Sequence, residues 1–63
     1  MSDRKEFPWA VCRWSGDTPI IVYTSSKRTI AVKYLGDLRA INSRFPYSIE
    51  DRNDLARRGV PNA

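Results

Sequence analysis

The sequence predicts an α+β fold: a small single domain in which a β-hairpin packs on one amphipathic helix, followed by a short C-terminal helix. The length of 63 residues is enough for one domain only. Hydrophobic residues make up 41% of the chain and charged residues 29%, which is the balance of a globular protein rather than a disordered one. The hydrophobic pattern changes from two extended runs to one helical repeat, and this change predicts a hairpin and then a helix.

The domain is expected to occupy residues 7–59. Residues 1–6 are polar and are predicted to form a flexible N-terminus, and residues 60–63 form a short tail. The N-terminus lacks the apolar segment of a secretory signal, and the longest apolar run is far shorter than the roughly 20 residues that span a membrane. The single cysteine, Cys12, fits a reducing compartment, so we expect a cytoplasmic protein.

Two extended runs predict the hairpin. Residues 7–14 are rich in aromatic and apolar side chains, and Pro8 must lie at the start of this strand or on an edge because it has no amide proton to donate. Residues 15–19, Ser-Gly-Asp-Thr-Pro, have the composition of a turn. Residues 20–25 begin with β-branched and aromatic side chains and are expected to form the second strand.

Both faces of this hairpin are apolar. In each strand the apolar side chains divide between the faces: Trp9 and Val11 against Ala10, Cys12 and Trp14, and Ile20 and Val22 against Ile21 and Tyr23. One helix covers only one face, and a two-stranded hairpin is marginal alone. We therefore expect the second face to be covered by the C-terminal helix, by a second copy of the chain in a homodimer, or by a target.

Residues 27–43 have the periodicity of an amphipathic helix, and Ser25 and Ser26 offer N-cap oxygens before it. Apolar residues recur on one side at spacings of three and four: Ile30, Ala31, Tyr34, Leu35, Leu38 and Ile41. We expect this side to pack on the hairpin. The predicted core comprises Val11, Ile20, Val22, Ile30, Tyr34, Leu35, Leu38 and Ile41, with Trp9 and Phe45 at its margin.

Residues 49–58 are predicted to form the short C-terminal helix. Ser48 with Asp51 resembles a capping box, and Gly59 suits a left-handed helix end. Asp54 and Arg58 have the spacing of an ion pair one turn apart. In an alternative interpretation, residues 45–49 form a third short strand and the helix starts later.

The residue types argue against catalysis and against a metal site. The chain has no histidine and one cysteine, so it lacks the commonest general base and cannot supply the four nitrogen and sulfur ligands of a usual zinc site. Glu50, Asp51 and Asp54 lie where they would stabilise a helix N-terminus, and no glycine-rich phosphate loop occurs. We therefore expect no enzyme activity, cofactor, metal or small-molecule substrate.

The charge pattern favours a polyanionic partner. The net charge is +4, phosphate contacts need cations presented together, and base stacking needs exposed aromatic rings. The candidate binding residues are Arg13, Lys27, Arg28, Lys33, Arg39 and Arg44 for charge, and Trp14 and Tyr23 for contact area. We therefore expect a small non-enzymatic binding protein that acts on nucleic acid, of the short cytoplasmic kind that phages and mobile elements encode.

A second hypothesis is that this basic face binds an acidic surface of a larger protein. The order of hairpin, Ser/Thr cap and amphipathic helix resembles small phage proteins that inhibit host RNA polymerase. The resemblance covers about half of the chain and is carried by Phe7, Trp9-Ala10-Val11 and Ile21-Val22-Tyr23-Thr24. It implies an inhibitor acting in the host cytoplasm. The ribbon-helix-helix order of strand, helix and helix is a third interpretation, from which the chain departs by an additional first strand and a more polar second helix.

Overall fold

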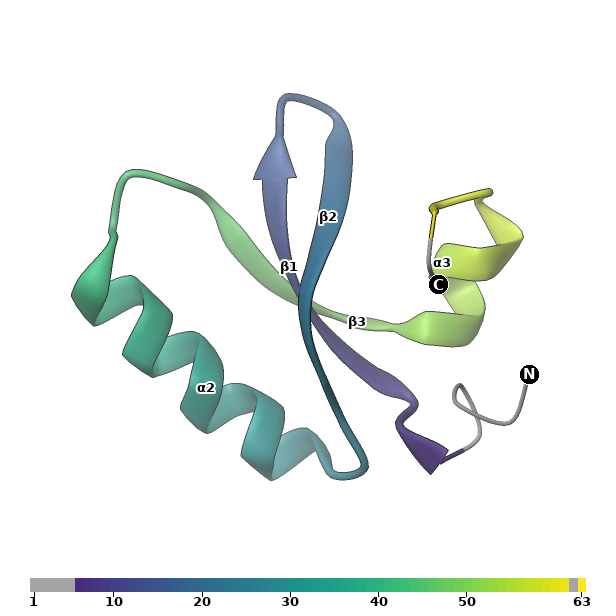
Figure 1. Cartoon of the computed structure of the whole chain (residues 1–63), viewed down its shortest axis with the longest axis horizontal. Coiled ribbons are helices and arrows are strands. Elements are labelled where there is room, and N and C mark those ends of the chain that lie inside the picture. Colours follow the sequence, from purple (N-terminus) through teal and green to yellow (C-terminus); the bar gives the residue numbers. More distant parts are fainter. Residues whose placement is uncertain (1–5, 62) are drawn as a thin grey trace.

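The computed structural model of the chain describes residues 6–61 and 63 and has an α+β fold with a three-stranded antiparallel sheet (Figure 1). In chain order the elements are β1 (Trp9–Ser15), β2 (Thr18–Ser25), α2 (Arg28–Ile41), β3 (Tyr47–Asp51) and α3 (Arg52–Arg57). The strand order is β2-β1-β3, so β1 is central. The predicted fold class is confirmed, including the third strand of the alternative interpretation. The expected flexible segment falls mainly on residues 1–5, which lie outside the described residues.

A two-residue turn, Gly16-Asp17, joins β1 to β2. Gly16 has a φ of 63°, in the left-handed region that favours glycine. The turn is shorter than the sequence suggested, because Thr18 and Pro19 belong to β2 and pair with β1. Pro19 is tolerated there because β2 is an edge strand, in which one side of the backbone has no partner strand.

A β-bulge in the hairpin decides which side chains of β2 face the helix. Val11 pairs with Tyr23, whereas the next residue of β1, Cys12, pairs with Ile21, so Val22 is the additional residue. Tyr23 therefore shares a face with Val11, and its ring stacks on Tyr34 of α2 with centroids 4.0 Å apart. Strict alternation had predicted Val22 in the core, and the bulge is the reason that this prediction is wrong.

Both faces of the sheet contain buried apolar side chains. On the face that α2 covers, Val11 of β1 is fully buried, and Ala31 is the buried residue of α2. On the other face Leu55 of α3 packs with Ala10 and Cys12. The C-terminal segment therefore covers part of the second apolar face, on the side of the sheet away from α2 (Figure 1).

The predicted core is right for Val11 and wrong for several other apolar side chains. Tyr34, Leu35, Leu38 and Trp9 are half-buried, whereas five side chains are between 38% and 81% exposed: Ile20, Val22, Ile30, Ile41 and Phe45. Successive residues of a helix are 100° apart, so a helix that approaches the sheet through Ala31 turns its neighbour Ile30 to the flank. The hairpin tip projects beyond α2, which leaves Ile20 uncovered (Figure 1).

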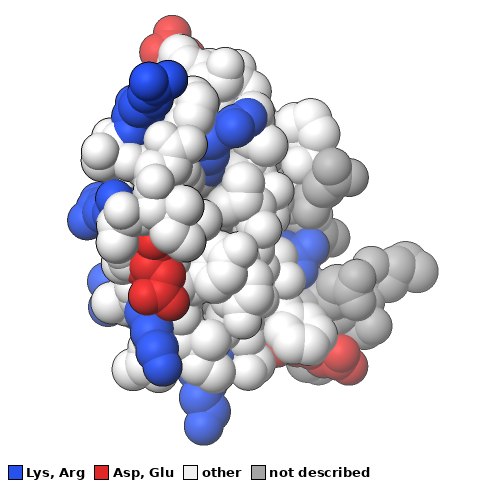
Figure 2. All heavy atoms as spheres, turned by 60° about the vertical axis from the view of Figure 1, so that its left-hand side comes forward, with Lys and Arg blue, Asp and Glu red and all other residues white. Residues whose placement is uncertain are grey.

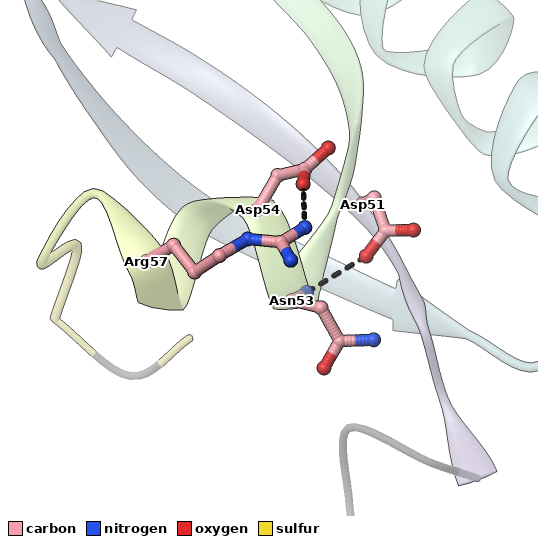
Figure 3. Close-up of polar contacts among 4 residues, drawn as sticks. All are labelled: Asp51, Asn53, Asp54 and Arg57. Atoms are coloured by element: carbon pink, nitrogen blue, oxygen red, sulfur yellow. Dashed lines mark hydrogen bonds and ion pairs between the residues drawn. The ribbon is translucent and has the colours of Figure 1, made fainter.

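The helix α3 begins three residues later than predicted. Residues 49–51, expected to be helical, belong to β3 and pair with β1. Asp51 rather than Ser48 caps the helix, because its side-chain oxygen accepts the backbone N–H of Asn53 at 2.8 Å (Figure 3). Asp54 forms its ion pair with Arg57, three residues on, rather than with Arg58 (Figure 3).

The end of α3 is the one predicted from Gly59. This residue has a φ of 80°, and its N–H donates to the carbonyl of Ala56 at 3.0 Å. The N–H of Val60 donates to the carbonyl of Leu55, also at 3.0 Å, which completes a Schellman motif. The motif reverses the chain, and Val60 then packs against the cluster of Ala10, Cys12 and Leu55.

Candidate functional site

The excess positive charge of the chain is confined to α2 and the residues next to it. Residues 27–44 contain one acid, Asp37, and five bases, which we call the cationic layer: Lys27, Arg28, Lys33, Arg39 and Arg44. The net charge of this segment is +4, equal to that of the whole chain, so the rest of the sequence is neutral on balance. The predicted cations of the helix thus form a distinct charged region rather than a general surface excess.

Three of these cations, Arg28, Lys33 and Arg39, belong to α2, whereas Lys27 is its N-cap and Arg44 follows it. Ala31 faces the sheet, and Arg28 and Arg39 lie on one flank with Val32 between them, at helical spacings of four and seven. Lys33 points further outward, and all five side chains of the cationic layer are exposed. Figure 2 brings the α2 side of the molecule forward and shows blue cationic groups along one side of this face, with a red acidic group among them.

The backbone at each end of the helix is fixed by a short polar side chain. Lys27 is the N-cap residue of α2, and its N–H donates to Ser25 Oγ at 3.1 Å. Arg44 lies in the loop after α2, where its N–H donates to Asn42 Oδ1 at 3.2 Å. Within residues 6–61 and 63, none of the five cationic side chains forms an ion pair, so their charge is free to meet an external anion.

Arg13 lies beside the cationic layer in a more enclosed setting. It is half-buried, and its guanidinium carbon lies 4.8 Å from the ring centroid of Phe45, a cation–π contact. In the sheet it lies between Ile20 of β2 and Tyr47 of β3. Arg13 thus joins the hairpin to the loop after α2, next to Arg44.

The structure does not bring Trp14 and Tyr23 to the cationic layer. Trp14 is adjacent to Arg13 in a strand and therefore points to the opposite face, where its Nε1–H donates to Ser48 Oγ at 2.7 Å. Tyr23 is half-buried and stacked on Tyr34. The exposed ring nearest to a layer residue in sequence is Phe45, which the hydrophobic pattern assigned to the core margin. Phe45 lies between Arg44 and Pro46, directly after the helical repeat, and this sequence context indicates a loop.

An open groove lies on the face opposite α2. Its volume is about 400 Å³, and it lies between the hairpin tip and the residues after α3, with Trp14, Pro19, Arg58 and Pro61 in its walls. Asp17 and Arg58 both line it, so the groove has no excess of either charge. It is therefore chemically unlike the cationic layer.

The remaining titratable group of interest is the thiol of Cys12. Burial, with a smaller contribution from the negative charge of Glu50, raises the pKa of this thiol to about 11. A thiol that stays protonated and buried is a poor nucleophile. Cys12 therefore belongs to the packing of the sheet.

Neither helix of the described residues has the length and apolar character of a membrane span. In that same part of the chain, no group of three or more His, Cys, Asp or Glu side chains is arranged to hold a metal ion. The chain matches no family model, and it has no significant match among curated proteins or among solved structures. The fold and the cationic layer define a small α+β domain with one basic helical side.

Proposed function

We propose that this protein is a non-enzymatic nucleic-acid-binding protein that contacts phosphates through the cationic layer. The observation that carries the proposal is the segregation of charge. Five exposed cations without ion pairs among the described residues lie on one helix and its ends, and they account for the whole net charge of +4. Cations held close together on one rigid element bind a row of phosphates and release the counterions condensed there.

The dimensions of α2 suit this role. A helix of 14 residues is about 21 Å long, and the layer residues extend from its N-cap to the loop beyond its C-terminus. Lys27 and Arg28 also begin the helix, where the backbone N–H groups favour an anion. We expect the layer to neutralise roughly three to five phosphates, and affinity to fall with salt on a log–log slope of about −2 to −4.5.

The test is a titration of a labelled oligonucleotide, followed by fluorescence anisotropy at several salt concentrations between about 50 and 200 mM. We expect the double variant Lys33→Gln/Arg39→Gln to bind more weakly and to have a slope shallower by roughly 1.4 to 1.8. The control Arg57→Gln/Arg58→Gln removes the same charge from the last residue and the C-cap of α3, on the other side of the sheet, and we expect it to change binding little. Absence of binding at low salt, or equal loss in both variants, would refute the proposal.

A second candidate function is binding to an acidic protein surface. It is favoured by the apolar side chains beside the layer, since Ile41 is 81% exposed and Ile30 44%. Addition of a strand from the partner is disfavoured at β2, because Pro19 and the bulge at Val22 interrupt that edge. In this case the isoleucines would matter as much as the cations: Ile30→Ser/Ile41→Ser would abolish capture of the partner, whereas nucleic acid binding would hardly change.

A further inference from the structure

We propose that the nucleic acid is single-stranded and that an unpaired base stacks on Phe45, beside the Arg13 guanidinium. This inference rests on the proposed function and specifies the partner of the same side of the molecule. Three features support it: the exposure of the Phe45 ring, the cation packed against it, and the fixed loop that carries it.

Phe45 is 39% exposed and directly follows Arg44, the last cation of the layer. The Arg13 guanidinium lies over its ring at 4.8 Å. Bases stack on aromatic rings and on guanidinium planes alike, whatever their identity, because every base has a π face. A ring and a guanidinium in contact, next to a phosphate-binding cation, provide the combination that a single-stranded segment needs: one charge for its backbone and one platform for a base.

The loop that carries Phe45 is tied to the fold on both sides. The N–H of Asn42 donates to the carbonyl of Leu38 at 2.8 Å, and Asn42 Oδ1 accepts the N–H of Arg44. On the other side, the carbonyl of Pro46 accepts the N–H of Trp14 in β1 at 2.9 Å. The backbone on both sides of Phe45 is therefore held in place before a ligand arrives, which lowers the entropic cost of binding.

The surroundings of Arg13 extend the platform. Ile20 and Tyr47 flank Arg13 in the neighbouring strands and share its face of the sheet, and Ile20 is 38% exposed. Ile20 and Tyr47 lie beyond the C-terminal end of α2. A nucleic-acid strand whose phosphates follow α2 therefore reaches these side chains next to Arg44. The bases of a duplex are already stacked on one another and offer no free face to Phe45. The platform therefore favours a single strand over a duplex with the same phosphates.

The experiment compares three labelled ligands of about 12 nucleotides: oligothymidylate, an abasic strand of equal phosphate number, and a duplex. We expect the protein to bind oligothymidylate more tightly than either of the others. The variant Phe45→Ala should lose about 5- to 140-fold in affinity for oligothymidylate and keep its affinity for the abasic strand. Its salt slope should stay unchanged, because no cation has been removed.

Three further variants separate stacking from folding. Phe45→Leu keeps an apolar side chain of similar volume but lacks a π face, so it should lose affinity as Phe45→Ala does while melting at the temperature of the unmodified protein. Phe45→Trp should restore tight binding. Ile41→Ala is the control: it removes an apolar side chain at the end of α2 that is more exposed than Phe45, and it should leave affinity unchanged.

The outcomes distinguish this inference from the proposed function. If Phe45→Ala and Phe45→Leu bind oligothymidylate as the unmodified protein does, or if the duplex binds as tightly as the single strand, base stacking is refuted. The proposed function then stands as long as the salt slope remains and depends on Lys33 and Arg39. If no ligand binds at low salt, both fail together.

Discussion

Single residues decide which parts of this small molecule are buried, and Cys12 is the most informative. It is fully buried in the central strand, in contact with a cluster that includes Ala10 and Leu55. A lone cysteine among apolar residues behaves as a small hydrophobe, and this burial is typical of one. The pKa of its thiol therefore measures how well the folded sheet excludes water.

Cys12 should make the stability of the protein decrease at high pH. Its pKa is raised from 9.0 to about 11 in the folded state, so the folded thiol keeps its proton where the unfolded thiol has lost it. The unfolded state thus binds fewer protons across this window, and the free energy of unfolding falls as pH rises from about 9 to 11. Below pH 9 the thiol is protonated in both states, so the stability that the buried neutral thiol contributes is fully present.

Urea denaturation of the protein and of Cys12→Ala at a series of pH values checks this expectation. The loss of stability between pH 9 and 11 should be smaller in the variant, because other groups that titrate there are common to both proteins. Parallel pH profiles would show that the thiol is not desolvated in the folded state. Reaction of Cys12 with a thiol reagent should accordingly follow unfolding.

The exposed positions of the lysines and arginines of α2 could also be predicted from the sequence. The face of the sheet to which each side chain of β2 points could not. Exposed lysines and arginines need no partner, so their positions on a helix follow from its periodicity. The facing of Val22 and Tyr23 depends on a bulge that no local pattern announces. The exposure of Phe45 depends on how far α2 extends over the sheet, which is a property of packing.

At the scale of elements, local signals gave the hairpin and α2 but misplaced the start of α3. The residues 47–51, Tyr-Ser-Ile-Glu-Asp, carry both a capping pattern and a short alternation. These residues form a strand because they pair with the free edge of β1, from Arg13 to Trp9. The partners in this pairing lie far away in the sequence, so no local pattern predicts it. Asp51 then serves both elements, as the last residue of β3 and the N-cap of α3.

The two helix-associated glycines should respond in opposite ways to substitution by alanine. Gly59 has a φ of 80°, where a Cβ costs about 1 to 2 kcal/mol, so Gly59→Ala should destabilise the protein although a Cβ there would meet no atom within 4 Å. Gly36 lies in the exposed interior of α2 with equally open surroundings, so Gly36→Ala should stabilise the protein by about 0.5 to 1 kcal/mol.

Thermal unfolding followed by circular dichroism measures both changes, each variant serving as the control for the other. A lower melting temperature for Gly59→Ala and a higher one for Gly36→Ala are expected. Equal melting temperatures for the two variants would mean that the Schellman end of α3 frays in solution and does not hold Val60 against the sheet.

At the scale of the whole molecule, the excess charge lies on one side of the sheet, although apolar side chains are buried on both sides. The α3 side carries the cluster of Ala10, Cys12 and Leu55 and a groove lined by one acid and one base. The α2 side carries the net charge of +4. Like charges placed along one helix repel one another and lower the stability of the folded state. Their placement is understandable if a polyanion neutralises them.

The most direct test of this division is a titration of the isotopically labelled protein with oligothymidylate, followed residue by residue through its amide chemical shifts. We expect the shifts to concentrate in residues 27–46 and in the neighbouring Arg13 of β1, with the amides of residues 52–61 nearly unmoved. Shifts centred on the groove between the hairpin tip and the end of α3, or no shifts at low salt, would contradict binding through the cationic layer.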